Sequence, residues 1–314
     1  MPPGCGGVPD LRPPGAPYRG GVRVVSLLPS ATEIVYALGL GDRLVGVTFE
    51  CDEPPAARRE KAVVVGGMDT SGLAPAEIDA AVRRRVAAGE DLYTLHRDAL
   101  AALDPDLVLT QDLCRVCALP AGQVDRALAH LGCRADVLTL DPHSLEDVFA
   151  TITAVGRRAG VPERAAELIG SLRARLAAVA DRVAGRPRPR VAVVEWVEPP
   201  FPAGHWVPDQ VAAAGGEPVA CLPGARSVPV GWDFFAAADP EVVVVAPCGF
   251  GLDGAVEQAA AVARALPGRP VWALDGNAVV VRPGPRLVDG VEVLAALLHP
   301  DAGHPAPGTA VRVA

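Results

Sequence analysis

Lysine is almost absent from this chain of 314 residues, since Lys61 is the only one among its 29 basic residues. A mechanism that forms a Schiff base would therefore have to use Lys61. Positive charge is also in deficit, because 37 acidic residues outnumber the 29 basic ones and give a net charge of −8. This balance argues against a diffuse basic surface for phosphate backbones, so we expect no nucleic-acid partner.

Long hydrophobic runs are missing as well. No apolar stretch reaches the roughly 18 residues that a membrane-spanning helix needs, so we expect no membrane insertion. The segment 1–21 holds Cys5 but no apolar run typical of a secretory or lipoprotein signal. The 7 cysteines are too few and too dispersed for a disulfide framework. These features together predict a cytoplasmic monomer with reduced thiols.

Short β-branched runs alternate with Ala-, Leu- and Arg-rich stretches, which is the pattern of an α/β protein with parallel sheets. At about 150 residues per domain, the length allows two domains. After the first predicted strand, Ser30 and Glu33 have the spacing of a helix capping box. The predicted strands are 22–27, 44–48, 62–65, 106–110, 135–140, 190–197, 217–219, 241–246 and 271–274.

The strand pattern stops between 144 and 183, where apolar residues recur at intervals of three and four. This spacing predicts a long helix, interrupted at Pro162. We therefore expect two Rossmann-like lobes with parallel sheets, joined by one long helix. The expected division is a disordered tail 1–21, an N-terminal lobe 22–143, a connecting helix 144–185, a C-terminal lobe 186–300 and a tail 301–314.

The residues that follow each predicted strand are the candidates for a binding site, because ligands of open α/β sheets bind beyond the carboxyl ends of the strands. Aromatic residues make up only 4% of the chain, yet several of them follow strands. This favours a ligand with a large flat or apolar surface, although the same rings could instead close the ends of the lobes. The candidates are Phe49, Glu50, Cys51, Met68, Gln111, Leu113 and Cys114 in the first lobe, and Phe201, His205, Trp206, Cys248, Phe250 and Asn277 in the second.

Familiar enzyme motifs are absent: the sequence has no Walker loop, no Gly-x-Ser-x-Gly elbow and no His-Glu-x-x-His. Binding is therefore the favoured function. The alternative is a cytoplasmic metal- or thiol-dependent enzyme, because Cys114 and Cys117 form a Cys-x-x-Cys pair just after a strand. With Cys51, and with Cys248 or His205 as a fourth ligand, these thiolates could complete a tetrahedral zinc or iron site, or all of them could be inert, partly buried thiols.

Several motifs together resemble the iron-siderophore/vitamin B12 solute-binding protein family. These are the segments 26–33, 37–47, 104–110, 239–245 and 282–286, and the resemblance covers roughly residues 22–300. The segments 50–52, 113–118, 204–206 and 247–250 are similar to the branch of cobalamin-binding proteins. The chain departs from that branch at Phe49, where a His is usual, and at Val279, Val280 and Val281, where aromatic residues and Asn are usual.

The resemblance implies a periplasmic-binding-protein-like fold with a helical backbone and a ligand held in the cleft between the lobes. The implied ligand is cobalamin or a related corrinoid, with an iron chelate or haem as second choice. The implied role is ABC-type uptake or intracellular corrinoid handling. Arg282 joins the ligand-binding candidates through its motif, and Asp98 and Asp233 match the acidic residues that the family presents to an ABC permease.

Overall fold

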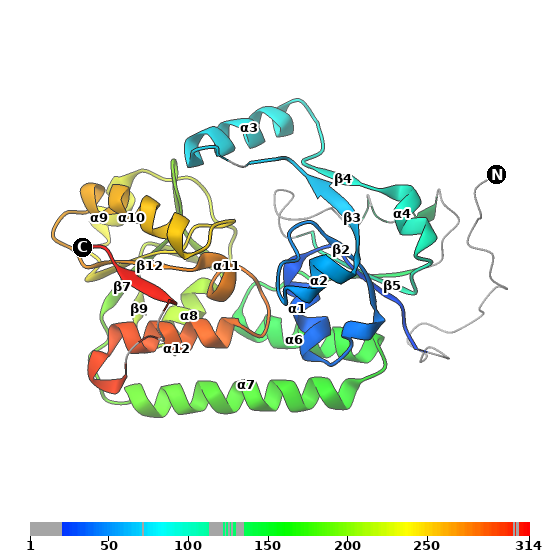
Figure 1. Cartoon of the computed structure of the whole chain (residues 1–314). Coiled ribbons are helices and arrows are strands. Elements are labelled where there is room, and N and C mark those ends of the chain that lie inside the picture. Colours follow the sequence, from blue (N-terminus) through cyan, green and yellow to red (C-terminus); the bar gives the residue numbers. More distant parts are fainter. Residues whose placement is uncertain are drawn as a thin grey trace. The chain divides into compact units, whose positions relative to one another are not determined.

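A computed structural model describes residues 21–70, 72–112, 122, 124, 126, 128–129, 135–303, 305 and 308–314. The chain divides into two compact units. The first unit comprises Met1–Gly72, Ala80–Asp141 and Phe149–Ile169, and the second comprises Leu73–Asp79, Pro142–Val148 and Gly170–Ala314. Each unit contains its own sheet, and the expected α/β class is confirmed (Figure 1).

The sheet of the first unit has the strand order β4-β3-β2-β1-β5-β6. Its described strands pair in parallel except for β3 and β4, which are antiparallel. In β5 all residues are buried, which agrees with the continuous hydrophobic runs of strands covered on both faces. The strands are β1 (Val24–Ser26), β2 (Leu44–Thr48), β3 (Ala62–Gly67), β4 (Tyr93–Leu95), β5 (Leu107–Thr110) and β6 (Asp136–Thr139).

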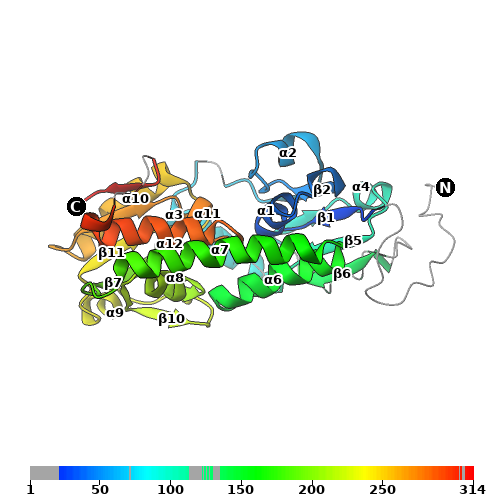
Figure 2. The same cartoon turned by 90° about the horizontal axis from the view of Figure 1, so that it is seen from below.

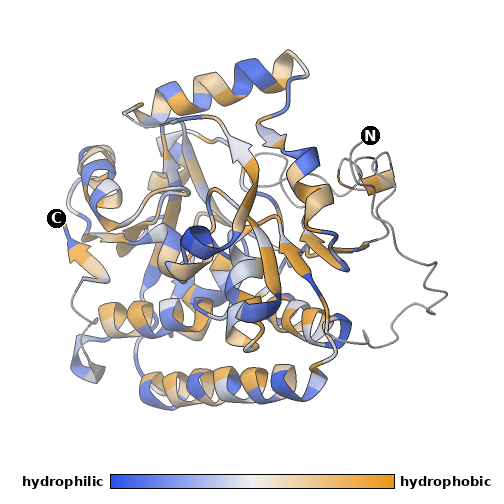
Figure 3. Cartoon of the chain, turned by 45° about the vertical axis from the view of Figure 1, so that its right-hand side comes forward, coloured by the Kyte–Doolittle hydropathy of each residue, from blue (hydrophilic) through white to orange (hydrophobic). Residues whose placement is uncertain are grey.

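Helices of the first unit cover this sheet and close a hydrophobic core. The described helices between its strands are α1 (Pro29–Ala37), η1 (Gly41–Arg43), α2 (Ala56–Glu60) and α4 (Arg97–Ala102), while α3 (Pro75–Ala87) has residues in both units. One core cluster consists of Val25, Leu27, Val64, Val65, Leu100, Val108, Val124 and Leu128. Figure 3 shows the hydrophobic colour concentrated along strands, whereas helices carry both colours, as expected for elements with one buried face.

Helix α1 begins one residue before the predicted capping box. Leu28 is its N-cap residue without a side-chain cap, and Pro29 occupies the first turn, where proline fits best. Ser30 and Glu33 are buried inside the helix, so the predicted capping box is wrong. The helix ends at Ala37 with Leu38 as its C-cap residue, and the following Gly39, with a φ of 68°, makes the left-handed turn typical of helix C-termini.

The sheet of the second unit has the order β10-β8-β7-β11-β12-β13, and β9 pairs with β7. Two of its pairs are antiparallel, β7 with β8 and β12 with β13. The strands are β7 (Arg190–Val197), β8 (Pro200–His205), β9 (Glu217–Pro218), β10 (Cys221–Pro223), β11 (Val242–Val245), β12 (Val271–Leu274) and β13 (Ala310–Arg312). The helices are α8 (Val207–Ala213), α9 (Trp232–Ala237), α10 (Leu252–Ala265), α11 (Gly276–Val279), α12 (Leu287–Leu298) and η2 (Pro300–Ala302).

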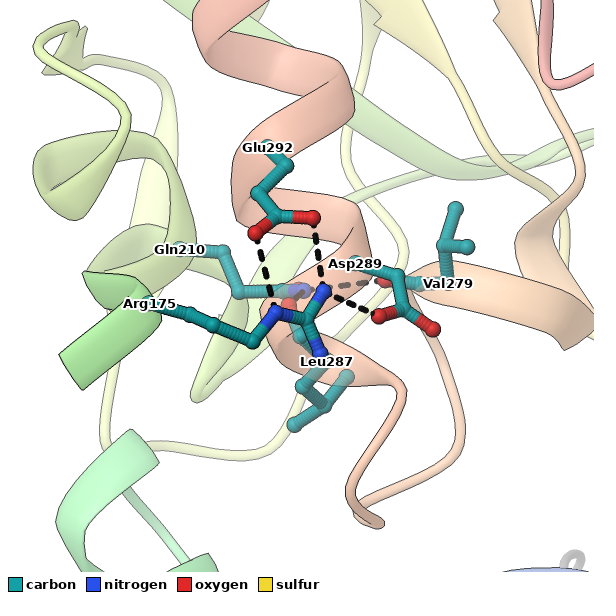
Figure 4. Close-up of polar contacts among 6 residues, drawn as sticks. All are labelled: Arg175, Gln210, Val279, Leu287, Asp289 and Glu292. Carbon is teal, nitrogen blue, oxygen red and sulfur yellow. Dashed lines mark hydrogen bonds and ion pairs between the residues drawn. The ribbon is translucent and has the colours of Figure 1, made fainter. Parts of the chain in front are cut away.

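The C-terminal part of α7 (Pro162–Val183) runs beside α12 in the second unit (Figure 2). Arg175 of α7 donates from Nε to Glu292 Oε1 at 2.9 Å and from Nη2 to Glu292 Oε2 at 2.6 Å and Asp289 Oδ1 at 2.5 Å. Next to this cluster, Gln210 of α8 donates from Nε2 to two buried carbonyl groups (Figure 4). These contacts fix α7, α8 and α12 to one another.

Both units build the same turn before a central strand. Asp104 and Asp239 each precede a proline and adopt positive φ angles of 42° and 43°. Two residues later a carboxylate accepts a hydrogen bond from the backbone at the start of the neighbouring parallel strand. The bonds are Arg23 N to Asp106 Oδ2 at 2.8 Å and Arg190 N to Glu241 Oε2 at 2.8 Å. The turn thereby sets the register of β5 against β1 and of β11 against β7.

Some elements differ from the expected division. The span 144–185, expected as one connecting helix, contains α6 (Leu145–Arg158) and α7, and α7 begins at the predicted interruption, Pro162. Residues Ala310–Arg312, expected within a tail, form an edge strand on β12. Within the part of the chain that the structure describes, no helix has the length and apolar character needed to cross a membrane.

Candidate functional site

The first unit places two aromatic rings at one end of its sheet. Phe49 directly follows β2, and its ring centre lies 6.4 Å from that of Tyr93 in β4. A Cβ atom on Gly67 would lie 2.4 Å from the Phe49 ring, so this glycine leaves the space that the ring occupies. Arg58 donates from Nη1 to the carbonyl oxygen of Phe49 at 3.0 Å. Both rings are half-buried, and they form a partly open apolar surface.

Glu50 and Cys51 lie in different environments although they are adjacent. The half-buried Glu50 carboxylate accepts a hydrogen bond from the Tyr93 hydroxyl at 3.5 Å. The Cys51 side chain is fully buried, with its Sγ 3.1 Å from Thr32 Oγ1 and 3.3 Å from Thr48 Oγ1. A thiol surrounded in this way packs as part of the interior of the first unit.

Two further candidates of the first unit follow strands as expected. Met68 comes after β3 and is half-buried, and Gln111 comes after β5 and is buried. Leu113, Cys114 and Cys117 lie outside the described residues, so the metal set that needs both cysteines stays a prediction. Among the described residues, no group of three or more His, Cys, Asp or Glu side chains could hold a metal ion.

The second unit has a corresponding aromatic pair. The ring centres of Trp196 in β7 and Phe250 after β11 lie 5.7 Å apart with an angle of 55° between the planes. Phe201 in β8 is opposite Trp196 in the antiparallel register, so it lies within a strand and not after one. Trp196 donates from Nε1 to the carbonyl oxygen of Glu198 at 3.0 Å, which fixes its ring. All three rings are half-buried.

The turn after β11 carries the exposed thiol of Cys248. The backbone N–H of Cys248 donates to the Glu195 carbonyl oxygen at 3.0 Å, and that of Gly249 donates to Asn277 Oδ1 at 3.0 Å. The Asn277 side chain therefore stabilises the backbone of this turn. Burial raises the pKa of the Cys221 thiol, whereas Cys248 is the exposed one among the described free cysteines.

His205 ends β8 in an unusual conformation, since its φ of 46° is in the left-handed region that non-glycine residues rarely adopt. Its imidazole stacks on Trp206 at 5.5 Å. Trp206 is buried, and its Nε1 donates to the Val280 carbonyl oxygen at 2.8 Å, so this ring anchors the segment inside the unit. Burial lowers the pKa of His205, and the nearby His143 and Arg226 lower it further.

The other predicted residues lie at the surface or close to it. Arg282 follows α11 and is half-buried. Asp98 and Asp233 are exposed, and each lies in the first turn of a short helix, α4 and α9 respectively. The acidic residues expected to face a permease therefore occupy matching positions in the two units.

Sequence reasoning missed three residues that the structure adds. These are Trp196, which lies inside the predicted strand 190–197, Tyr93 of β4, and His143 before α6. The ring centre of His143 is 5.8 Å from that of His205. The scarcity of aromatic residues could have drawn attention to Trp196 and Tyr93, but only the register of β7 and of β4 brings them to Phe250 and Phe49.

Comparison with known proteins gives a consistent picture. A family model described as periplasmic binding protein matches residues 24–275. The chain is 26% identical over 292 residues to the uncharacterized ABC transporter substrate-binding lipoprotein YvrC of Bacillus subtilis, covering 89% of this chain and 80% of that protein. It is 26% identical over 280 residues to the vitamin B12-binding protein of Vibrio cholerae, covering 88% of each.

Solved structures share the fold. A periplasmic heme binding protein from Pseudomonas aeruginosa superimposes with a TM-score of 0.68 at 24% identity, covering 93% of this chain and 98% of that one. The periplasmic heme-binding protein BhuT in complex with two hemes has a TM-score of 0.63 at 27% identity, covering 90% and 99%. These likenesses confirm the expected two-lobe α/β fold.

The comparisons correct the expected location. A cytoplasmic protein, and with it intracellular corrinoid handling, was expected from residues 1–21, the lack of apolar runs and the few dispersed cysteines. This expectation is wrong, because residues 24–275 match periplasmic binding proteins. The same match confirms that the chain is a binding protein and not an enzyme. It thereby removes the alternative of a cytoplasmic metal- or thiol-dependent enzyme.

Proposed function

The chain belongs to the periplasmic binding protein family, and from this premise we propose that it delivers a corrinoid, with cobalamin as first choice, to an ABC uptake system. Similarity to a substrate-binding lipoprotein of an ABC transporter supports the uptake role. Similarity to a vitamin B12-binding protein over 88% of both chains supports the ligand.

The pairing of aromatic rings at the ends of the sheets carries the proposal. Phe49 lies against Tyr93 in the first unit, and Phe250 lies against Trp196 in the second. A macrocycle presents a large flat apolar surface, and half-buried rings fixed by backbone contacts can cover such a surface without much loss of side-chain entropy. Glu50, which accepts from Tyr93, and Asn277, which holds the backbone next to Phe250, add polar groups for the amide-rich rim of a corrinoid.

Haem is the second candidate. Its support is the 27% identity to a heme-binding protein solved with two hemes. Haem has the same flat apolar body, so the aromatic rings serve either ligand. The two macrocycles differ at the rim, where haem carries carboxylates and a corrinoid carries amides. A ferric hydroxamate is the third candidate, and it lacks the extended flat surface.

A competition titration tests the ligand. Purified protein is titrated separately with hydroxocobalamin, hemin and ferric hydroxamate, and binding is followed by visible absorption and by calorimetry. We expect one-to-one binding with the tightest Kd for hydroxocobalamin. Tighter binding of hemin would make haem the ligand in place of a corrinoid. The absence of binding of all three compounds would overturn the proposal.

A matched pair of variants tests the role of the rings. Phe250→Leu removes the ring that contacts Trp196 and is expected to weaken corrinoid binding about 2- to 12-fold, from a loss of about 0.5–1.5 kcal/mol. Phe234→Leu is the control, because Phe234 is an exposed ring of α9 that contacts Phe235. Equal Kd values for the two variants would show that the ligand does not contact the Phe250 and Trp196 pair.

We also propose that Asp98 and Asp233 contact basic residues of the permease partner. Both carboxylates are exposed and occupy the first turn of a six-residue helix, so they are available to a partner and lie at equivalent positions of the two units. Their charge complements arginine side chains, which bind carboxylates in a bidentate manner.

A further inference from the structure

Two histidines from distant parts of the chain meet in the second unit. His143 precedes α6, and His205 ends β8. Their ring centres are 5.8 Å apart with an angle of 49° between the planes. Neither ring contacts the Trp196 and Phe250 pair in any described interaction, so this pair of imidazoles is a separate feature of the unit.

The hydrogen bond of His143 fixes its tautomer. His143 Nδ1 lies 3.0 Å from the carbonyl oxygen of Gly224. A carbonyl oxygen can only accept, so Nδ1 carries the proton and donates it. In the neutral ring the lone pair then belongs to Nε2. An imidazole that donates from one nitrogen to a backbone carbonyl and keeps the other free has the arrangement of metal-ligating histidines. His143 is also exposed, so an ion can reach it from solvent.

His205 offers a second nitrogen without a partner. Its Nε2 is buried and makes no hydrogen bond. A buried polar atom of this kind costs free energy, and an ion is one of the few groups that can satisfy it. Two backbone hydrogen bonds hold His205 in place. Its backbone N–H donates to the Ala225 carbonyl oxygen at 2.8 Å, and its backbone carbonyl oxygen accepts from Gly224 N at 3.0 Å.

We propose that His143 and His205 together bind a divalent transition-metal ion of the Ni²⁺, Cu²⁺ and Zn²⁺ class. Metal–nitrogen bonds of about 2.0–2.1 Å to each ring would place the ring centres roughly 5.2 Å apart at a tetrahedral bond angle and roughly 6.4 Å apart at a linear one. The observed 5.8 Å falls in this range. Imidazole nitrogen is a ligand that these ions prefer over the carboxylate and carbonyl oxygens suited to Mg²⁺ or Ca²⁺.

The charged groups around the two histidines include one that attracts a bound cation and one that repels it. Asp147 accepts hydrogen bonds from the backbone N–H groups of His143 and Ser144, both at 3.0 Å, and these bonds lower its pKa, so a carboxylate lies beside the pair. Arg226 is a cation close enough to His205 to lower its pKa, and it opposes a second cation. With two protein ligands and water completing the coordination, the ion is held reversibly.

Nickel is the probe for the test, because it favours imidazole. The complete chain, freed of metal with a chelator and without any solute, is titrated with NiCl₂ by calorimetry. We expect one saturable Ni²⁺ site per chain. His143→Gln and His205→Asn are each expected to weaken Ni²⁺ binding at least about tenfold, since even the residues that hydrogen-bond to metal ligands and orient them contribute about 10- to 100-fold to metal affinity. Asn tolerates the left-handed backbone at position 205, so this variant is expected to fold.

His96→Ala is the control, because His96 is an exposed histidine of the first unit. It is expected to bind Ni²⁺ as the parent protein does. Unchanged affinity in both His143→Gln and His205→Asn, or a comparable loss in His96→Ala, would overturn the site. No saturable binding up to about 1 mM Ni²⁺ would also overturn it. Because no corrinoid or haem is present, this result is independent of the ligand titration.

Discussion

Replacing Arg175 by Met should loosen the attachment of α7 to α12 while keeping the apolar stem of the side chain. Hydrogen bonds to Glu292 and Asp289 raise the pKa of Arg175, so it stays charged under all working conditions. The side chains of Arg175, Asp289 and Glu292 are 36%, 42% and 37% exposed, and solvent therefore screens each pair in part.

The magnitude follows from counting these contacts. A single exposed ion pair contributes about 0.2–1 kcal/mol, and Arg175 makes a bidentate pair with Glu292 and a further bond to Asp289. After its removal, Asp289 and Glu292 face each other three positions apart on α12, which costs about 0.2–0.5 kcal/mol more. We expect Arg175→Met to lower the free energy of unfolding by about 1–2 kcal/mol.

Urea denaturation followed by circular dichroism measures this loss, with Arg173→Met as control. Arg173 is on the same helix, but its single pair with Glu146 is 56% and 70% exposed, so we expect a loss below about 0.5 kcal/mol. A double-mutant cycle of Arg175→Met with Glu292→Gln should give a coupling energy of about 1 kcal/mol that decreases in 1 M salt. Equal losses for Arg175→Met and Arg173→Met, or a coupling energy unaffected by salt, would refute the reasoning.

Further predictions concern buried polar groups, pH and the permease. Gln258 is buried and neither of its amide atoms has a hydrogen-bond partner, so Gln258→Leu should raise the free energy of unfolding by about 1 kcal/mol. Gln210→Leu loses two hydrogen bonds and should lower the free energy of unfolding by about 2 kcal/mol. Thermal melts in which both variants change stability in the same direction would contradict this prediction. The pKa of His205 is lower in the folded state than the ordinary value of about 6.5, so the unfolded chain binds more protons in this window and stability should fall as the pH drops below about 6.5. Urea midpoints between pH 7 and pH 5 should fall less in His205→Asn than in the parent, and parallel curves would disprove the assignment. Asp98→Asn and Asp233→Asn should each reduce solute uptake in reconstituted vesicles without changing the Kd for the solute, and a changed Kd would place these residues in the binding site instead.

Strands with continuous β-branched runs were predictable from local sequence. The boundaries 44–48, 190–197 and 271–274 agree with β2, β7 and β12, because such runs are buried on both faces and leave no alternative pattern. Strand β8 was not predicted, because Pro200 and Pro202 lack the N–H that a strand ladder uses and so disfavour a strand, although both lie in the antiparallel pairing with β7. The start of α1 was misplaced because residue type suggested a cap at Ser30, whereas Pro29 already begins the helix.

The candidate site was predictable as a set of strand ends but not as a set of contacts. Phe49 and Phe250 were identified because they follow strands, yet their partners Tyr93 and Trp196 are fixed by strand register. The direction of the side chains could not be predicted from the sequence either. Cys51 and Trp206 follow strands as a binding residue would, but both side chains are buried within their own units. His143 joins His205 only through the fold of the second unit.

The repeated turn at Asp104 and Asp239 makes both sheets depend on a backbone conformation that few residues tolerate. Each aspartate precedes a proline and adopts a positive φ angle, and two residues later a carboxylate accepts a hydrogen bond from the neighbouring strand. The helices α1 and α8 are likewise each followed by a glycine with a positive φ angle, Gly39 at 68° and Gly215 at 83°. A β-branched residue at any of these four positions would strain the backbone, so the two units share the same points of sensitivity to substitution.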